Sequence, residues 1–120
     1  MRAERRFSAG LIDAHPPSPD WPGRIARFVG RVGRATGAQP QVQRDAAEPL
    51  LLRLEKGELD VVIGPMAPTS PWEKQVSLLP ALAEHVGPDR HLRLAAIARN
   101  GENEWIELLH GEALAERAAR

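Results

Sequence analysis

The spacing of apolar residues changes along the first half of the chain, and each spacing predicts a different element. Residues 7–13 form a short apolar run that ends at a group of prolines, which is typical of a buried strand. Asp20 and Pro22 are typical of a helix start, and Gly37 and Pro40 close the helix that follows. The inward face of this helix carries apolar residues at helical spacing: Ile25, Phe28, Val29 and Val32.

A second strand and a second helix are predicted next. Residues 41–43 suit a brief strand, and Asp45 is placed to cap a helix, with Glu48 three residues further on as in a capping box. This helix carries leucines and ends at Gly57. Residues 59–64 are rich in β-branched side chains, which is typical of a buried parallel strand. Strands and helices that alternate in this way over about 60 residues predict a doubly wound α/β sheet.

The pattern of the second half is less regular. Three prolines make residues 64–72 a loop. Residues 76–86 fit either a strand or a helix, although Pro80 argues against one uninterrupted helix. Residues 92–98 favour a strand by their length and by the residues that flank them.

The chain is expected to end in a helix that opens at Gly101 or Asn103. Gly111 weakens or ends this helix, and residues 112–120 are expected to fray. Its inward residues are Trp105, Ile106 and Leu109. Its outward residues include Glu102, Glu104 and Glu107, which we interpret as a solvated edge. Together these elements predict one open sheet of about five strands with helices on both faces.

Length and charge restrict the class of protein. The 120 residues fit one domain over residues 1–120, with residues 1–6 and 112–120 expected to be flexible. Sixteen Lys and Arg residues balance 16 Asp and Glu residues, so no net field attracts nucleic acid or an anionic membrane. No apolar run of about 20 residues is present to span a membrane. The basic start at Arg2, Arg5 and Arg6 lacks the clean apolar run of a signal peptide. We therefore expect a cytoplasmic protein unless a leader has been removed.

Residues that carry metal or catalytic chemistry are sparse. The chain has no cysteine, and its histidines are scattered without the spacing of a metal site: His15, His85, His91 and His110. No phosphate-binding glycine motif and no G-x-S-x-G motif occurs. We therefore expect no metal, no cofactor and no catalytic residue.

Four arginines share one face of the first predicted helix: Arg24, Arg27, Arg31 and Arg34. Clustered cations of this kind suit contacts to nucleic-acid phosphates. They also suit the solvated face of an ordinary amphipathic helix. We favour the solvated face because the net charge is zero and aromatic residues are few.

The predicted fold itself favours one location for a ligand. Ligands of open α/β sheets bind outside the carboxyl ends of the strands, near the point where the strand order reverses. In this chain those ends are residues 13–15, 44–45 and 64–69. The candidate ligand-binding residues are Asp13, His15, Asp45, Met66, Thr69, Ser70 and Trp72. The alternative is that these proline-rich loops only cover the end of the sheet.

Several stretches resemble a known family when they are taken in order. They are Ala14 to Pro17 (Ala-His-Pro-Pro), Leu51 to Gly64, Met66 to Val76 and Leu94 to Ile106. This order resembles the family 3 extracellular solute-binding proteins, the receptors of bacterial ABC importers of polar amino acids. The resemblance implies a single periplasmic-binding-protein-like lobe that binds a small solute and performs no chemistry. It also implies a periplasmic location if a leader is removed.

Two departures from this family change the expected mechanism. The chain passes through His85–His91 with no room for the family's second lobe, so a single lobe offers half of the ligand contacts. Trp72 stands where the family's carboxylate-gripping arginine aligns, and Ala67 replaces a hydroxyl. The ligand is therefore either an amino acid or an aromatic or other organic acid. We expect a homodimer in which a second copy restores the cleft.

Two other functions remain open. The Leu51 to Gly64 block is shared with the effector domains of LysR-type regulators. An interaction or regulatory module with a degenerate ligand site is therefore the first alternative. The second is a dehydratase-like enzyme, because a few members of the resembled family are dehydratases. It would use Asp13, His15 or Asp45 as its acid or base.

Overall fold

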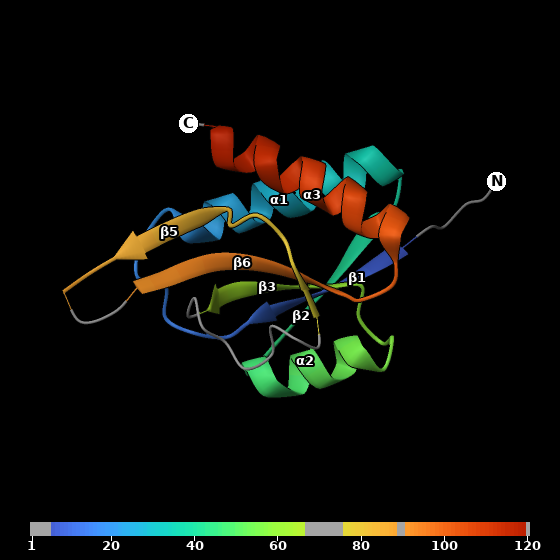
Figure 1. The fold of residues 1–120 in the computed structure, drawn as a ribbon, viewed down its shortest axis with the longest axis horizontal. Helices are drawn as coiled ribbons and strands as arrows, with labels where there is room; N and C mark the ends of the chain where they lie inside the picture. Colours follow the sequence, from blue (N-terminus) through green and yellow to red (C-terminus); the bar gives the residue numbers. More distant parts are fainter. Residues whose placement is uncertain (1–5, 67–75, 89–90, 120) are drawn as a thin grey trace.

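The protein folds as one sheet with helices on both faces (Figure 1). The computed structural model describes residues 6–66, 76–88 and 91–119. The elements are β1 (Arg6–Ile12), α1 (Trp21–Thr36), β2 (Gln39–Asp45), α2 (Ala47–Glu55), β3 (Val61–Met66), β4 (Val76–Leu78), β5 (Ala83–Val86), β6 (His91–Arg99) and α3 (Asn103–Ala118). The described residues thus form six strands, where the sequence predicts about five.

The strand order is β2-β1-β3-β6-β4, with β5 also paired to β6. β1 runs parallel to both β2 and β3, whereas β6 is antiparallel to β3, β4 and β5. From β1 the chain crosses to β2 on one side and then returns past β1 to β3 on the other. The strand order therefore reverses at the boundary between β1 and β3, where doubly wound sheets bind their ligands.

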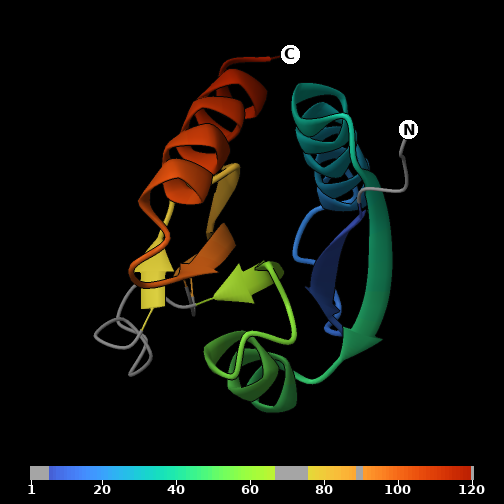
Figure 2. The same cartoon turned by 90° about the vertical axis from the view of Figure 1, so that its right-hand side faces the viewer.

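The alternation of side chains along each strand divides the core into two layers. Phe7, Ala9 and Leu11 face α1 and α3, whereas Ile12 faces α2. Figure 2 shows α1 and α3 side by side on one face of the sheet and α2 alone on the other. Gly10 lies beneath α2, and an added Cβ there would meet side-chain carbons of Leu50 and Leu59 at 2.9 Å. A glycine at this position therefore lets α2 pack close to β1.

The first half of the fold confirms most of the predicted elements. Helix α1 starts after Asp20 and ends at Gly37, whose φ of 69° is the left-handed conformation that glycine adopts without strain. The predicted helix cap at Asp45 is wrong, because α2 begins at Ala47 and its N-cap is Ala46. The Asp45 carboxylate instead accepts hydrogen bonds from the Ala46 N–H and from Arg53 of α2.

Residues 76–86, which the sequence left as strand or helix, form two short strands. β4 and β5 both pair with β6, and Pro80 lies between them. β5 and β6 form an antiparallel hairpin with Val86 opposite His91. The chain therefore passes directly from β5 to β6, as the sequence predicts. Helix α3 continues through Gly111 to Ala118 because Ala113 and Glu116 are buried against the rest of the fold.

Candidate functional site

The carboxyl ends of β1, β2 and β3 lie at one edge of the sheet. The pairing register places Ile12 beside Asp45, and the Asp13 N–H donates a 2.8 Å hydrogen bond to the carbonyl of Asp45. β3 approaches β1 from the other side at Gly64, where an added Cβ would lie 2.4 Å from the Cβ of Ile12. The three strand ends that the sequence predicts to converge are therefore neighbours.

A pocket of about 370 Å³ lies beside this edge, on the face of the sheet that α1 covers. Its walls come from the end of β1 and the segment after it, from the first half of α1, and from β2 and β3. Lining residues include Ala14, Pro16, Trp21, Ala26, Val42 and Arg44. Among the described residues that line it, Arg44 is the one charged side chain. Arg44 forms no hydrogen bond or ion pair with another described residue.

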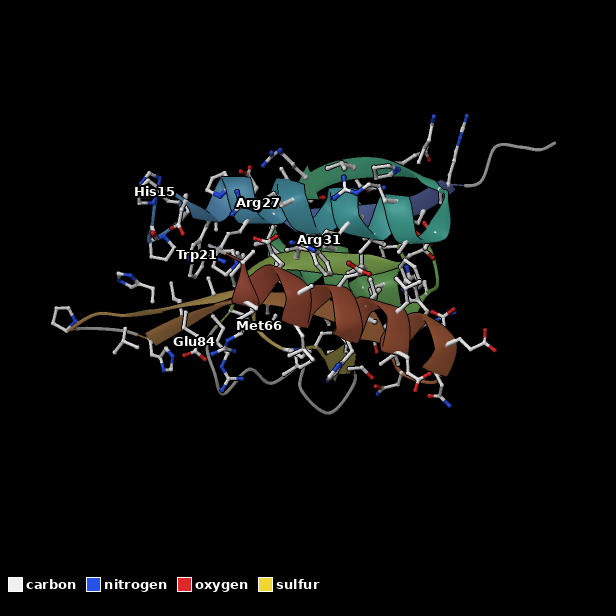
Figure 3. The ribbon with its side chains drawn as sticks, turned by 90° about the horizontal axis from the view of Figure 1, so that it is seen from above. His15, Trp21, Arg27, Arg31, Met66 and Glu84 are labelled. Atoms are coloured by element: carbon white, nitrogen blue, oxygen red, sulfur yellow. The ribbon has the colours of Figure 1, made fainter. Side chains whose placement is uncertain are left out.

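The predicted residues Asp13 and His15 lie next to this pocket in the sequence but are not among the residues that line it. Both are exposed, and their neighbours Ala14 and Pro16 line the pocket. Figure 3 shows His15 at the end of the molecule, beyond the start of α1. The two side chains are therefore accessible to solvent beside the pocket.

The predicted residues Asp45 and Met66 face the opposite side of the sheet. The Oδ2 atom of Asp45 lies 3.1 Å from Arg53, and both side chains are about one third exposed. Met66, the last residue of β3, is half-buried and packs against the core layer of α2. The predicted residues Thr69, Ser70 and Trp72 lie outside the described residues. Their part in a site stays a prediction.

The sequence prediction did not include Trp21 and Arg44, which both line the pocket. Trp21, the first residue of α1, is 2% exposed, and its packing forms part of the pocket wall. Arg44 precedes the predicted residue Asp45, but successive side chains of a strand point to opposite faces. Arg44 therefore faces the pocket while Asp45 faces α2. Side-chain alternation along β2 would have predicted that Arg44 and Asp45 face opposite sides of the sheet. This prediction needed a strand that extends to Asp45, whereas the predicted strand ended at Gln43.

The arginine face of α1 is only partly solvated: Arg27 is exposed as predicted, whereas Arg24 and Arg31 are largely covered. Arg24, Arg27 and Arg31 converge on the carboxylate of Glu116 in α3, at 3.7, 3.1 and 3.2 Å. The Glu116 side chain is completely buried. Figure 3 shows Arg27 and Arg31 between the two helices. Three of the cations considered for phosphate binding are therefore used to join α1 to α3.

A second pocket, of about 430 Å³, lies at the opposite edge of the sheet, between Arg6, Glu102 and Trp105. Asp60, one of its two acidic lining residues, already accepts a hydrogen bond from the Ser8 N–H through its carboxylate. Its carbonyl accepts another from the indole N–H of Trp105. These polar groups therefore hold the fold together at this edge.

Neither a metal site nor a membrane helix is found in the part of the chain that the structure describes. No three His, Cys, Asp or Glu side chains there are grouped closely enough to share a metal ion. None of the helices described has both the length and the apolar character that crossing a membrane requires.

Known proteins resemble this chain in fold rather than in sequence. No protein-family model matches the chain, and no curated protein matches it. The arginine-bound form of domain 1 from TmArgBP superposes with a TM-score of 0.74 at 17% identity, covering 92% of each chain. A Salmonella typhimurium periplasmic binding protein described as having high arginine specificity gives 0.72 at 11% identity, covering 96% of this chain and 94% of that one.

A third similar structure is described as the precursor of an enzyme. It is an ancestral amino-acid-binding protein, described as a precursor of cyclohexadienyl dehydratase. Its TM-score is 0.71 at 10% identity, covering 92% of this chain and 88% of that one. All three likenesses establish the fold: this chain is an α/β lobe with the architecture of domain 1 of amino-acid-binding periplasmic proteins.

Proposed function

We propose that this chain binds a small organic acid in the pocket beside Trp21, with Arg44 contacting the carboxylate of the ligand. The observation that carries the proposal is Arg44, which has no hydrogen-bond or ion-pair partner among the described residues and lies in an otherwise apolar pocket at the carboxyl edge of the parallel strands. A pocket of about 370 Å³ is in the usual size range for small-molecule sites. An arginine offers two parallel N–H donors to a carboxylate, which makes it a strong anchor for an acid.

The rest of the pocket suits an apolar or aromatic group on the same ligand. Apolar lining favours burial of such a group by roughly 25 cal/mol for each Å² removed from water. Asp45 does not repel the acid strongly, because its carboxylate is held by Arg53 on the other face of the sheet. Asp13 is exposed beside the pocket and is the candidate contact for a ligand ammonium group, so an amino acid belongs to the same ligand class.

A solute-binding role without catalysis, as in import receptors, agrees with the neighbouring structures. One of them is a single domain in an arginine-bound form. That description supports the idea that one lobe of this fold is enough to hold an amino acid. The precursor of a dehydratase keeps the enzyme alternative open. Of its candidate residues Asp13, His15 and Asp45, the first two are exposed beside the pocket, whereas Asp45 is bound to Arg53 on the other face of the sheet.

The test asks which small acids bind, and compares one acid with its neutral amide. Thermal shifts are measured with L-amino acids, including arginine, and with phenylacetate against its neutral amide. A ligand at ten times its Kd stabilises the fold by about 1.4 kcal/mol, or roughly 5 °C for a domain of this size. We expect phenylacetate or an amino acid to give such a shift and phenylacetamide to give less than half of it.

Variants then locate the site. Arg44→Gln is expected to weaken acid binding at least tenfold. Arg34→Gln is the matched control, since Arg34 is exposed on α1 and does not line the pocket. Equal loss in both variants, or none in Arg44→Gln, would place the site elsewhere. Absence of a shift with every compound at millimolar concentration would favour the interaction module instead.

A further inference from the structure

β2 is a free edge of the sheet. It is the first strand in the order β2-β1-β3-β6-β4, and within the described residues no strand pairs with its outer side. Six of its seven residues are exposed, and the seventh, Asp45, is partly exposed. Figure 2 shows β2 along the outer border of the sheet. An exposed edge of this length offers its backbone groups to another strand.

One hydrogen bond fixes which backbone groups are free. The carbonyl of Asp45 accepts from the N–H of Asp13, so the backbone groups of Asp45 point toward β1. In a parallel pair, alternate residues point toward the partner strand and away from it. Gln41 and Gln43 therefore also point toward β1. The free groups belong to Pro40, Val42 and Arg44.

We propose that β2 pairs in an antiparallel manner with β2 of a second copy, about a two-fold axis at Val42. Each Val42 then donates to and accepts from the partner's Val42. Pro40 lies opposite the partner's Arg44, whose N–H donates to the proline carbonyl. Pro40 has no N–H, so the only acceptor left unmatched is the carbonyl of Arg44. This register uses the whole strand, because Val42 is its central residue.

The side chains are compatible with this pairing. Val42 is 49% exposed, and the pairing would cover it with the same residue of the partner. The two Arg44 side chains lie on opposite sides of the axis, so like charges do not meet directly. Two small residues of α1 lie near β2. An added Cβ at Gly33 would lie 3.8 Å from the Pro40 ring, and Ala26 lines the pocket together with Val42. No bulky side chain of α1 therefore blocks the edge at these positions.

The pairing also completes the ligand pocket, and this consequence rests on the function proposed above. Val42 and Arg44 line the pocket at its β2 side. Paired strands lie about 5 Å apart, so the partner's Val42 and Pro40 would extend this wall. A second copy would thus reduce the open side of a single lobe and bury more of the ligand. The pairing itself depends on β2 alone.

The test uses cysteines in a chain that has none of its own. Opposite residues that exchange hydrogen bonds have Cα atoms about 5.5 Å apart, which is within the range for a disulfide. Val42→Cys is therefore expected to give a cross-linked dimer on mild oxidation. In Arg44→Cys, the matched control, the cysteines are four residues apart along the pair, or about 14 Å, and are expected not to cross-link.

Light scattering of the wild-type chain at about 100 µM is expected to give the mass of a dimer. Val42→Lys places like charges opposite each other and is expected to raise the dimer dissociation constant at least tenfold. A monomeric wild-type chain, or equal cross-linking in the two cysteine variants, would overturn the pairing. These measurements need no ligand, so such a failure leaves the pocket to be judged by the Arg44→Gln binding test. Conversely, a dimer that binds no acid would remove the proposed function and keep the pairing.

Discussion

The contact between Glu116 and the arginines of α1 gives a sharp prediction about stability. Glu116 is fully buried in α3 and accepts hydrogen bonds from Arg27 at 3.1 Å and from Arg31 at 3.2 Å. Glu116→Gln keeps the size of the side chain and removes its charge. The variant also points an amide N–H₂ group at guanidinium donors, which cannot accept a hydrogen bond from it.

The exposure of the arginines determines how much unfolding free energy the Glu116→Gln variant is expected to lose. A hydrogen bond to a charged group contributes about 1.5–3 kcal/mol when it is shielded from water. The Arg31 side chain is 30% exposed and keeps most of this value, whereas Arg27 is 54% exposed and its contribution falls below about 1 kcal/mol. The arginines can be hydrated again, so the loss stays below the 3–5 kcal/mol typical of a fully buried pair. We expect Glu116→Gln to lower the free energy of unfolding by about 2 kcal/mol.

Urea denaturation followed by circular dichroism measures this change, with the slope m expected to stay constant. Glu107→Gln is the control, because Glu107 is exposed on the same helix, and its effect should lie within about 0.5 kcal/mol. A double-mutant cycle with Arg31→Met should give a coupling energy of about 1 kcal/mol or more. An equal effect of Glu116→Gln and Glu107→Gln would show that the buried carboxylate does not stabilise the packing of α1 against α3.

Three further predictions concern the backbone and pH. Gly64→Ala should destabilise the fold by about 1–3 kcal/mol in the same urea assay, because its Cβ would overlap a β1 side chain at 2.4 Å. Gly111→Ala should stabilise it by about 0.5–1 kcal/mol, since an added Cβ there has no atom within 4 Å and alanine favours helix; a loss of stability would contradict this. Hydrogen bonds from Ser18 and Arg24 lower the pKa of Asp20 below its ordinary value of 3.8. The contribution of Asp20 to stability is therefore present above pH 3.8 and is lost as the pH falls through the lower folded pKa. Ser18→Ala should raise this pKa in an NMR titration, and an unchanged titration curve would refute the assignment.

Much of the fold could be predicted because local patterns report burial. The helical spacing of Phe28, Val29 and Val32 predicted a face of α1 that the structure buries. The β-branched run after Leu59 predicted β3, which is buried over its first four residues. The doubly wound order also placed the candidate site at the carboxyl edge, where the pocket lies.

The sequence left an element open, or assigned a residue wrongly, where two structures share the same local pattern. Residues 76–86 are too short and mixed in pattern to distinguish a helix from two strands, and the pairing of β4 and β5 with β6 decides between them. Asp45 has the sequence signature of a helix cap, but its carboxylate binds Arg53 instead. A capping signature indicates which hydrogen bonds a side chain can form near a helix start. Which of them form depends on the residues that pack nearby in the fold.

The sequence by itself determined the order of the main strands and helices, the open α/β architecture and the edge at which a ligand is expected. These features follow from periodicity and turn residues, which act over a few positions. The tertiary structure alone decided that Glu116 would bind Arg31 across 85 residues, and that Arg44 would line a pocket without a partner among the described residues. Such contacts depend on how the helices pack and on which face of a strand is covered. They join residues that are far apart in the sequence, so local patterns do not predict them.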